Sequence, residues 1–164
     1  MKKLSLIVAG IVCSSSLYAS MDIGLVSAKL GDGGSNSGFN MDVKGFFHPK
    51  SLKGIGIGAS LGLNYFTIDK TSSLSDDAGL STDMDLLLGY DYKQATIFAG
   101  GGYTVGQVGS ATFDGTNYQV GAEYSFTKNY GIGVKYKHNR IDFTDFSSDK
   151  TDLDITSIYF KYTK

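Results

Sequence analysis

Residues 54–65 of the chain read GIGIGASLGLNY. The odd positions hold Ile, Ala, Leu or Tyr, and the even positions hold Gly, Ser or Asn. Successive side chains of a β-strand point to opposite faces, so a strand would separate these two sets, whereas helical spacing would mix them. The run is long enough for a tilted strand to cross a bilayer, which takes roughly 9–11 residues. The pattern therefore predicts a membrane-spanning strand with one apolar face.

Seven further segments of the chain alternate in the same way, which gives eight predicted strands in all. They cover residues 22–30, 41–47, 82–92, 95–105, 118–126, 130–137 and 156–162. In the first of them Val26, Ala28 and Leu30 form the expected apolar face, opposite Ser27 and Lys29. The faces opposite the apolar ones collect the charges, namely Lys29, Asp42, Lys44, Asp83, Asp85, Asp91, Glu123, Lys135, Lys137 and Lys161. Because a charge on a lipid face costs about 2–4 kcal/mol near the bilayer midplane, a membrane barrel has to sort its residues like this.

A water-soluble barrel would also alternate, but with its apolar face turned inward. The second face of this chain is rich in glycine, for example at Gly56, Gly58, Gly100 and Gly102. Glycine on a solvated strand surface weakens the strand, whereas inside a narrow barrel it leaves room for neighbouring side chains. The predicted fold is therefore all-β: a closed eight-stranded antiparallel up-and-down transmembrane β-barrel.

The first 19 residues have the features of a signal peptide. Lys2 and Lys3 are followed by an apolar stretch at residues 4–12, and Ala19 offers a cleavage site. Cys13 raises lipidation as an alternative, but Val12 stands before it, where a small residue is expected. The predicted organisation is a signal peptide at residues 1–19 and a barrel domain at residues 20–164.

The charge balance of the mature chain argues against binding to nucleic acid. Removing Lys2 and Lys3 from the 15 basic residues leaves 13 against 16 acidic ones, a net charge of about −3. A nucleic-acid binder would instead show a basic face.

The connections between the predicted strands alternate between long and short. The long ones are residues 31–39, 67–80, 106–116 and 139–152, and the shorter ones are residues 48–53, 93–94 and 127–129. Outer-membrane barrels combine long extracellular loops with short periplasmic turns. We therefore expect the long connections outside the cell and both termini in the periplasm.

Three stretches carry a family resemblance. Residues 120–126 (VGAEYSF), 131–136 (GIGVKY) and 28–31 (AKLG) are similar to strands of the small outer-membrane β-barrel family, the OmpA/OmpX-like and opacity-type porin-family proteins. The resemblance implies a Gram-negative outer membrane, insertion by the outer-membrane assembly machinery, and contact with membrane lipid and lipopolysaccharide. Members of the family usually end on an aromatic residue, whereas this chain ends Tyr162-Thr163-Lys164.

The candidate site is a network of charged side chains inside the barrel. It comprises Asp83, Asp85, Glu123, Lys135, Lys137 and Lys161. The hairpin register places Glu123 opposite Gly133 and diagonal to Lys135, within reach of a long side chain. An eight-stranded interior is only wide enough to be filled by side chains, so we expect this network to plug the lumen. A gated pore is the alternative.

Neither an enzyme nor a cofactor site is expected. His138 falls on the lipid face, but Arg140 stands two residues on, where a His-x-Ser hydrolase motif would carry its nucleophile, and His48 is expected alone in a turn. No helix is predicted after the glycine-rich runs, so they are not phosphate-binding loops. The acidic pair at residues 76–77 and the acidic stretch at 142–154 would either solvate the outer loops, which we favour, or bind Ca²⁺ or bridge lipopolysaccharide.

These observations predict a structural or surface-interaction protein of the cell outer membrane that acts through its extracellular loops. A small porin-like channel is the first alternative, and a lipid-modifying barrel enzyme is the second. The sequence does not identify a host or surface ligand for the loops.

Overall fold

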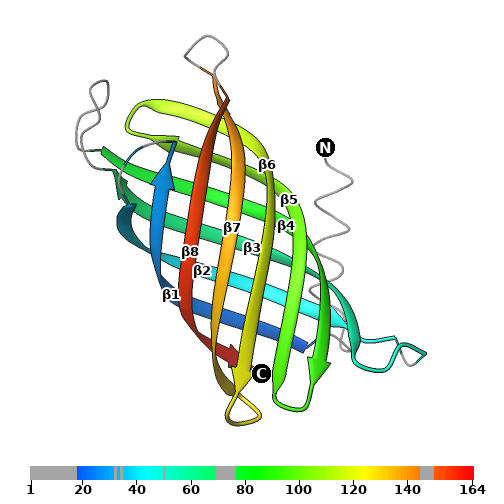
Figure 1. Cartoon of the computed structure of the whole chain (residues 1–164). Helices are drawn as coiled ribbons and strands as arrows, with labels where there is room; N and C mark the ends of the chain where they lie inside the picture. The colour runs from blue at the N-terminus through cyan, green and yellow to red at the C-terminus, as the bar shows by residue number, and fades with distance from the viewer. Residues whose placement is uncertain (1–17, 32, 34, 50, 69–76, 145–149) are drawn as a thin grey trace.

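The computed structural model describes residues 18–31, 33, 35–49, 51–68, 77–144 and 150–164. Eight antiparallel strands form a closed barrel, in which each strand pairs with its chain neighbours and β1 also pairs with β8 (Figure 1). The strands are β1 Tyr18–Leu30, β2 Ser35–Phe47, β3 Ile55–Ile68, β4 Asp77–Tyr92, β5 Ala95–Val108, β6 Ala111–Ser125, β7 Tyr130–Phe143 and β8 Lys150–Thr163. The predicted fold class is confirmed. The predicted signal peptide lies outside the described residues, apart from Tyr18 and Ala19, which begin β1.

The connections define two ends of the barrel. We call the end that carries connections 48–54, 93–94 and 126–129 the proximal end, and the opposite one the distal end. The last strand finishes at the proximal end, beside these connections (Figure 1). The two-residue turn at residues 93–94 is confirmed, and Lys93 takes a left-handed φ of 56° there. The next turn is one residue longer than predicted, but the predicted register of its hairpin, with Glu123 opposite Gly133, is confirmed.

Two of the predicted long connections are wrong. Residues 31–39 shrink to a connection at 31–34, and residues 106–116 shrink to the two-residue turn Gly109-Ser110. Polar residues made both segments resemble loops, but they continue the strands in register, as Lys29 with Ser35 and Val108 with Ala111 show. The other two, predicted at residues 67–80 and 139–152, are also shorter than predicted, because β3 and β4 take up residues 67–68 and 77–80 and β7 and β8 take up residues 139–143 and 150–152. Residues 69–76 and 145–149 lie outside the described residues.

Through most of its height the barrel has an apolar outer face and a polar interior. Leu25, Leu86 and Ile158 point outward and are 66–75% exposed. Inside, Asp83 and Lys137 are no more than 1% exposed. Glycine makes room for this interior, as predicted: a Cβ at Gly89 would lie only 2.9 Å from a ring carbon of Phe46.

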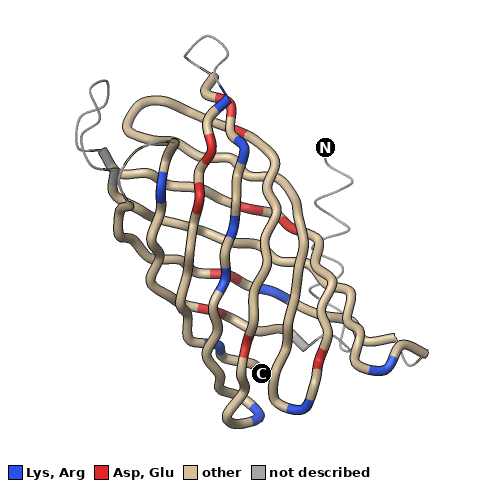
Figure 2. Tube along the Cα trace, in the orientation of Figure 1, with Lys and Arg blue, Asp and Glu red and all other residues tan. Residues whose placement is uncertain are grey.

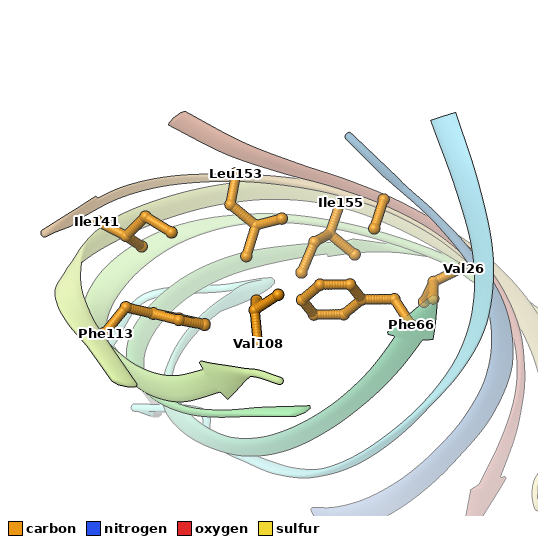
Figure 3. Close-up of a cluster of buried hydrophobic side chains, with 8 residues drawn as sticks. Val26, Phe66, Val108, Phe113, Ile141, Leu153 and Ile155 are labelled. Carbon is orange, nitrogen blue, oxygen red and sulfur yellow. The ribbon is translucent and has the colours of Figure 1, made fainter. Parts of the chain in front are cut away.

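At the distal end the two faces exchange character. Eight buried apolar side chains point into the barrel and pack together, as Figure 3 shows for seven labelled residues. They are Val26, Ala28, Phe66, Val108, Phe113, Ile141, Leu153 and Ile155. Many of the outward positions beside them are polar, for example Ser27, Thr116 and Arg140.

This exchange corrects the prediction for residues 22–30. Val26 and Ala28 are buried inside the barrel and Leu30 packs against the same apolar cluster, whereas Ser27 and Lys29 are exposed outside. The adjacent apolar residues Leu25 and Val26 mark the point where the strand passes from one environment to the other. The prediction took the apolar residues of the second half as the lipid face, and because side chains alternate regularly along a strand, it assigned the whole strand to the wrong faces.

A charged network in the barrel interior

Nine charged side chains from six strands meet in the middle of the lumen. They are Asp22 of β1, Asp42 and Lys44 of β2, Asp83 and Asp85 of β4, Glu123 of β6, Lys135 and Lys137 of β7, and Lys161 of β8. All are buried except Lys161, which is half-buried. Charged positions of both signs occur in the middle of the strands as well as at their ends (Figure 2).

One part of this network is centred on Lys137. Its Nζ lies 2.8 Å from Oδ2 of Asp83 and 2.8 Å from Oδ2 of Asp85. The amide groups of Asn64 and Gln119 donate hydrogen bonds to the same two carboxylates, at 2.6 and 2.7 Å. Two carboxylates of β4 therefore hold this buried lysine, and amides from β3 and β6 hold the carboxylates.

A second part is centred on Glu123, which faces Gly133 as predicted. Lys44 and the hydroxyl of Tyr159 donate to its Oε1, and Lys161 donates to its Oε2 at 2.9 Å. Lys44 also pairs with Asp22 at 2.5 Å. Glu123 therefore links strands that lie on opposite sides of the barrel.

The predicted contact between Glu123 and Lys135 is wrong. Lys135 pairs with Asp42, which also accepts a hydrogen bond of 2.7 Å from the amide of Asn40. In a closed barrel a long side chain can reach across the lumen, so its partner need not sit on the adjacent strand. Asp22 was missed because the prediction turned its face of the first strand toward the lipid. Asp22 lies on the same face as Val26 and Ala28, and a charge on that face was the available signal that the face points inward.

The two ends of the lumen differ. Toward the distal end, the network gives way to the apolar cluster of Figure 3. Toward the proximal end, it borders an open cavity of about 720 Å³, which we call the vestibule. His48, expected alone in a turn, lines this vestibule with its Nε2 2.8 Å from Oδ2 of Asp91.

A smaller polar cluster lies on the outside of the barrel, near the distal end. His138 lies 2.7 Å through Nδ1 from Oδ1 of Asp154 and 3.7 Å through Nε2 from Asp152. The hydroxyl of Tyr136 donates to Asp154 at 2.8 Å, and the ring of Tyr118 packs on His138 with centroids 4.9 Å apart. These contacts engage His138 with two carboxylates and an aromatic ring, and the exposed Arg140 follows two residues on.

Within the part of the chain that the structure describes, no group of three or more His, Cys, Asp or Glu residues is arranged to hold a metal ion. The same residues contain no helix with the length and apolar character needed to span a membrane.

Several solved structures resemble this barrel closely in shape. Neisserial surface protein A matches with a TM-score of 0.62 and 17% identity, over 92% of this chain and 98% of its own. The attachment invasion locus protein Ail of Yersinia pestis matches with a TM-score of 0.63 and 14% identity, over 92% of this chain and 100% of its own. The fold is that of the small outer-membrane β-barrels. This agrees with the predicted family resemblance and with the predicted location in the outer membrane.

The other comparisons limit what this likeness means for function. The outer membrane enzyme PagL has the same fold, with a TM-score of 0.60 and 11% identity over 86% of this chain and 98% of its own. No protein-family model matches the chain, and no curated protein sequence does. At these identities the likeness establishes the architecture and leaves the activity to be argued from this chain's own residues.

Proposed function

We propose that this chain is a non-catalytic outer-membrane barrel with a plugged lumen, and that it acts through its distal surface. The observation that carries the proposal is that two groups of side chains fill the inside of the barrel, one beyond the other along its axis. Buried ion pairs centred on Lys137 and Glu123 occupy the middle, and the apolar cluster lies beyond them. Moving ions through this path would require breaking the ion pairs and separating the apolar side chains, each of which costs several kcal/mol.

The distal surface is the part of the barrel that this proposal turns toward the outside of the cell. It comprises the polar outer face of the distal strands, and the connections at residues 69–76 and 145–149, which lie outside the described residues, are expected to add to it. Because two of the predicted long loops are tight connections, the strand faces themselves supply much of the surface available to a partner. One solved structure of Ail is a complex with the heparin analogue sucrose octasulfate, which supports a surface-binding role for this type of barrel. Lipid, lipopolysaccharide and the assembly machinery remain the other proposed partners.

A small channel is the second candidate, because the vestibule reaches inward as far as Lys44 and Glu123. Conductance of the purified protein in planar lipid bilayers separates the two functions. A plugged barrel should give no steady single-channel current, whereas a barrel with both Phe66→Ala and Lys137→Met substitutions should leak. Steady currents from the unmodified protein would reject the plugged lumen and favour the channel.

A further inference from the structure

The vestibule at the proximal end has the size of a small-molecule site. Its volume of about 720 Å³ lies within the range of roughly 300–1,000 Å³ that ligand pockets usually span. Strands from both sides of the barrel and the turns at residues 93–94 and 126–129 contribute to its wall. Phe46 and the buried ends of Lys44 and Glu123 lie at its inner limit.

Both carboxylates of the vestibule are already fully engaged. Oδ1 of Asp91 accepts a hydrogen bond of 2.6 Å from Thr96, and its Oδ2 pairs with His48. Glu123 accepts from Lys44 and Tyr159 through one oxygen and from Lys161 through the other. The vestibule therefore offers little to a cationic ligand, since each carboxylate oxygen has a partner within the protein.

By contrast, several hydrogen-bond donors that line the vestibule still have hydrogens to offer to a ligand. Lys93 and Lys128 line the vestibule and are exposed, and neither forms an ion pair with a carboxylate of the described residues. The Nζ of Lys93 lies 5.3 Å from the ring centroid of Tyr92. Lys161 donates one of its three hydrogens to Glu123, and the Oε1 of Gln94 accepts from Tyr124, which leaves the amide hydrogens of Gln94 for another partner.

We propose that the vestibule binds a small solute that carries a phosphate group. A dianionic phosphate matches the two exposed ammonium groups of Lys93 and Lys128, for which lysine acts as a point charge. The hydroxyl groups of Ser125 and Thr127 and the amide of Gln94 provide polar contacts for the rest of a sugar-sized molecule. In the proposed orientation the site faces the periplasm, so its ligand differs from any partner of the distal surface.

The test is calorimetric titration of the full barrel, in neutral maltoside micelles, with glucose 6-phosphate and with uncharged glucose. The unmodified protein should bind glucose 6-phosphate and not glucose. The double variant Lys93→Asn and Lys128→Gln should bind the phosphate about tenfold more weakly, because it removes both unpaired charges. Asparagine is chosen at position 93 because it tolerates the left-handed backbone there.

A matched control removes two positive charges from the distal end instead. The double variant Lys29→Gln and Lys150→Gln changes two exposed lysines and should leave the affinity for glucose 6-phosphate unchanged. An equal loss in this control would overturn the site, because binding would then follow net charge alone. Failure of the unmodified protein to bind, or equal binding of glucose, would also overturn it.

A lipid headgroup is the other possible source of the phosphate. Repeating the titration in nanodiscs of phosphatidylcholine, with and without phosphatidylglycerol, distinguishes the two sources. Competition by the anionic lipid that disappears in the Lys93 and Lys128 variant would assign the site to a headgroup. Binding that is indifferent to lipid composition would assign it to a soluble ligand. Both results support phosphate recognition by these two lysines.

Discussion

The membrane-level part of the barrel and its distal end are built from the same strands but with opposite patterns. At membrane level, apolar residues such as Leu86 face outward and charged ones such as Asp85 face inward. At the distal end, Phe66 and Ile155 are buried inside, while Lys29 and Arg140 are exposed outside. The difference shows that the surroundings change along the barrel. An apolar outer face suits acyl chains, and a polar outer face with an apolar core suits water.

The exchange of faces therefore marks the distal edge of the apolar, membrane-facing band on the strands that show it. On β8 the apolar positions shift from Leu153 and Ile155, which point inward, to Ile158 and Phe160, which point outward. Side chains alternate between the two faces in the same order along the whole strand of a closed barrel. The apolar residues therefore move from outward-pointing to inward-pointing positions of the sequence where the surroundings change. Beyond this boundary the barrel resembles the end of a soluble protein, and it is stabilised by a small core of its own.

The largest effect is expected from Lys137→Met, which removes the cation between Asp83 and Asp85 at membrane level. Two buried carboxylates would lose their shared partner, and breaking such a pair costs about 3–5 kcal/mol. Urea unfolding in lipid vesicles, followed by the gel shift between folded and unfolded barrel, measures the loss. Lys150→Met, at an exposed site, is the control and should change stability by less than about 0.5 kcal/mol. A similar small change in both variants would show that the ion pairs contribute nothing to folding.

The next effect tests the distal core. Phe66→Ala empties a fully buried position of the apolar cluster and should destabilise the barrel by about 3–5 kcal/mol, toward the lower limit if neighbours relax. The same urea titration applies. Phe39→Ala is the matched variant on the outer face, where the ring is 49% exposed, and it should lose clearly less. Equal losses at both positions would mean that the distal cluster is not a core.

The boundary itself can be tested by placing the same charge on the outer face at two heights. Leu86→Lys puts an ammonium group on the membrane-level face and should cost about 2–4 kcal/mol. Gln107→Lys puts one on the exposed outer face near the distal end of β5 and should cost almost nothing.

Spin labels at the two positions should report the same boundary, with lipid-soluble oxygen reaching residue 86 and a water-soluble relaxant reaching residue 107. If both reagents reached residues 86 and 107 equally well, no such boundary would lie between these two positions.

The smallest effect is expected at the outer polar cluster of the distal end. Asp154→Asn weakens the contacts with His138 and Tyr136, and partly exposed pairs of this kind contribute at most about 1 kcal/mol. The unfolding titration should therefore barely change, and adding salt to the unmodified protein should have an equally small effect. A loss above about 2 kcal/mol would show that Asp154 is shielded from water, which contradicts a solvated distal face.

Much of this structure could be predicted from local pattern. The alternation from Gly54 to Tyr65 predicted a strand, and its recurrence predicted eight strands and a closed barrel. The inward direction of Asp83, Lys135 and Lys137 followed from the same rule. Strand ends were harder to predict, because Ser35 and Thr112 are polar whether they lie in a loop or on a solvated strand face.

The ion-pair partners needed the tertiary structure. Register along one hairpin suggested Lys135 for Glu123, but closure of the barrel brought Lys44 and Lys161 to it from strands far away in the sequence. Which lysine reaches which carboxylate depends on barrel width and on the glycines that leave space, and neither is a property of one strand. The vestibule likewise combines turns and strands that only closure brings together.

The sequence by itself determined the strand period, the number of strands and the separation of charge from apolar surface, because these depend on neighbours along the chain. Only the tertiary structure decided where the two faces exchange roles, which charges pair, and where a cavity stays open. Those features depend on contacts across a closed sheet and on the change from lipid to water along its axis, which a local pattern records only as a shift in its phase.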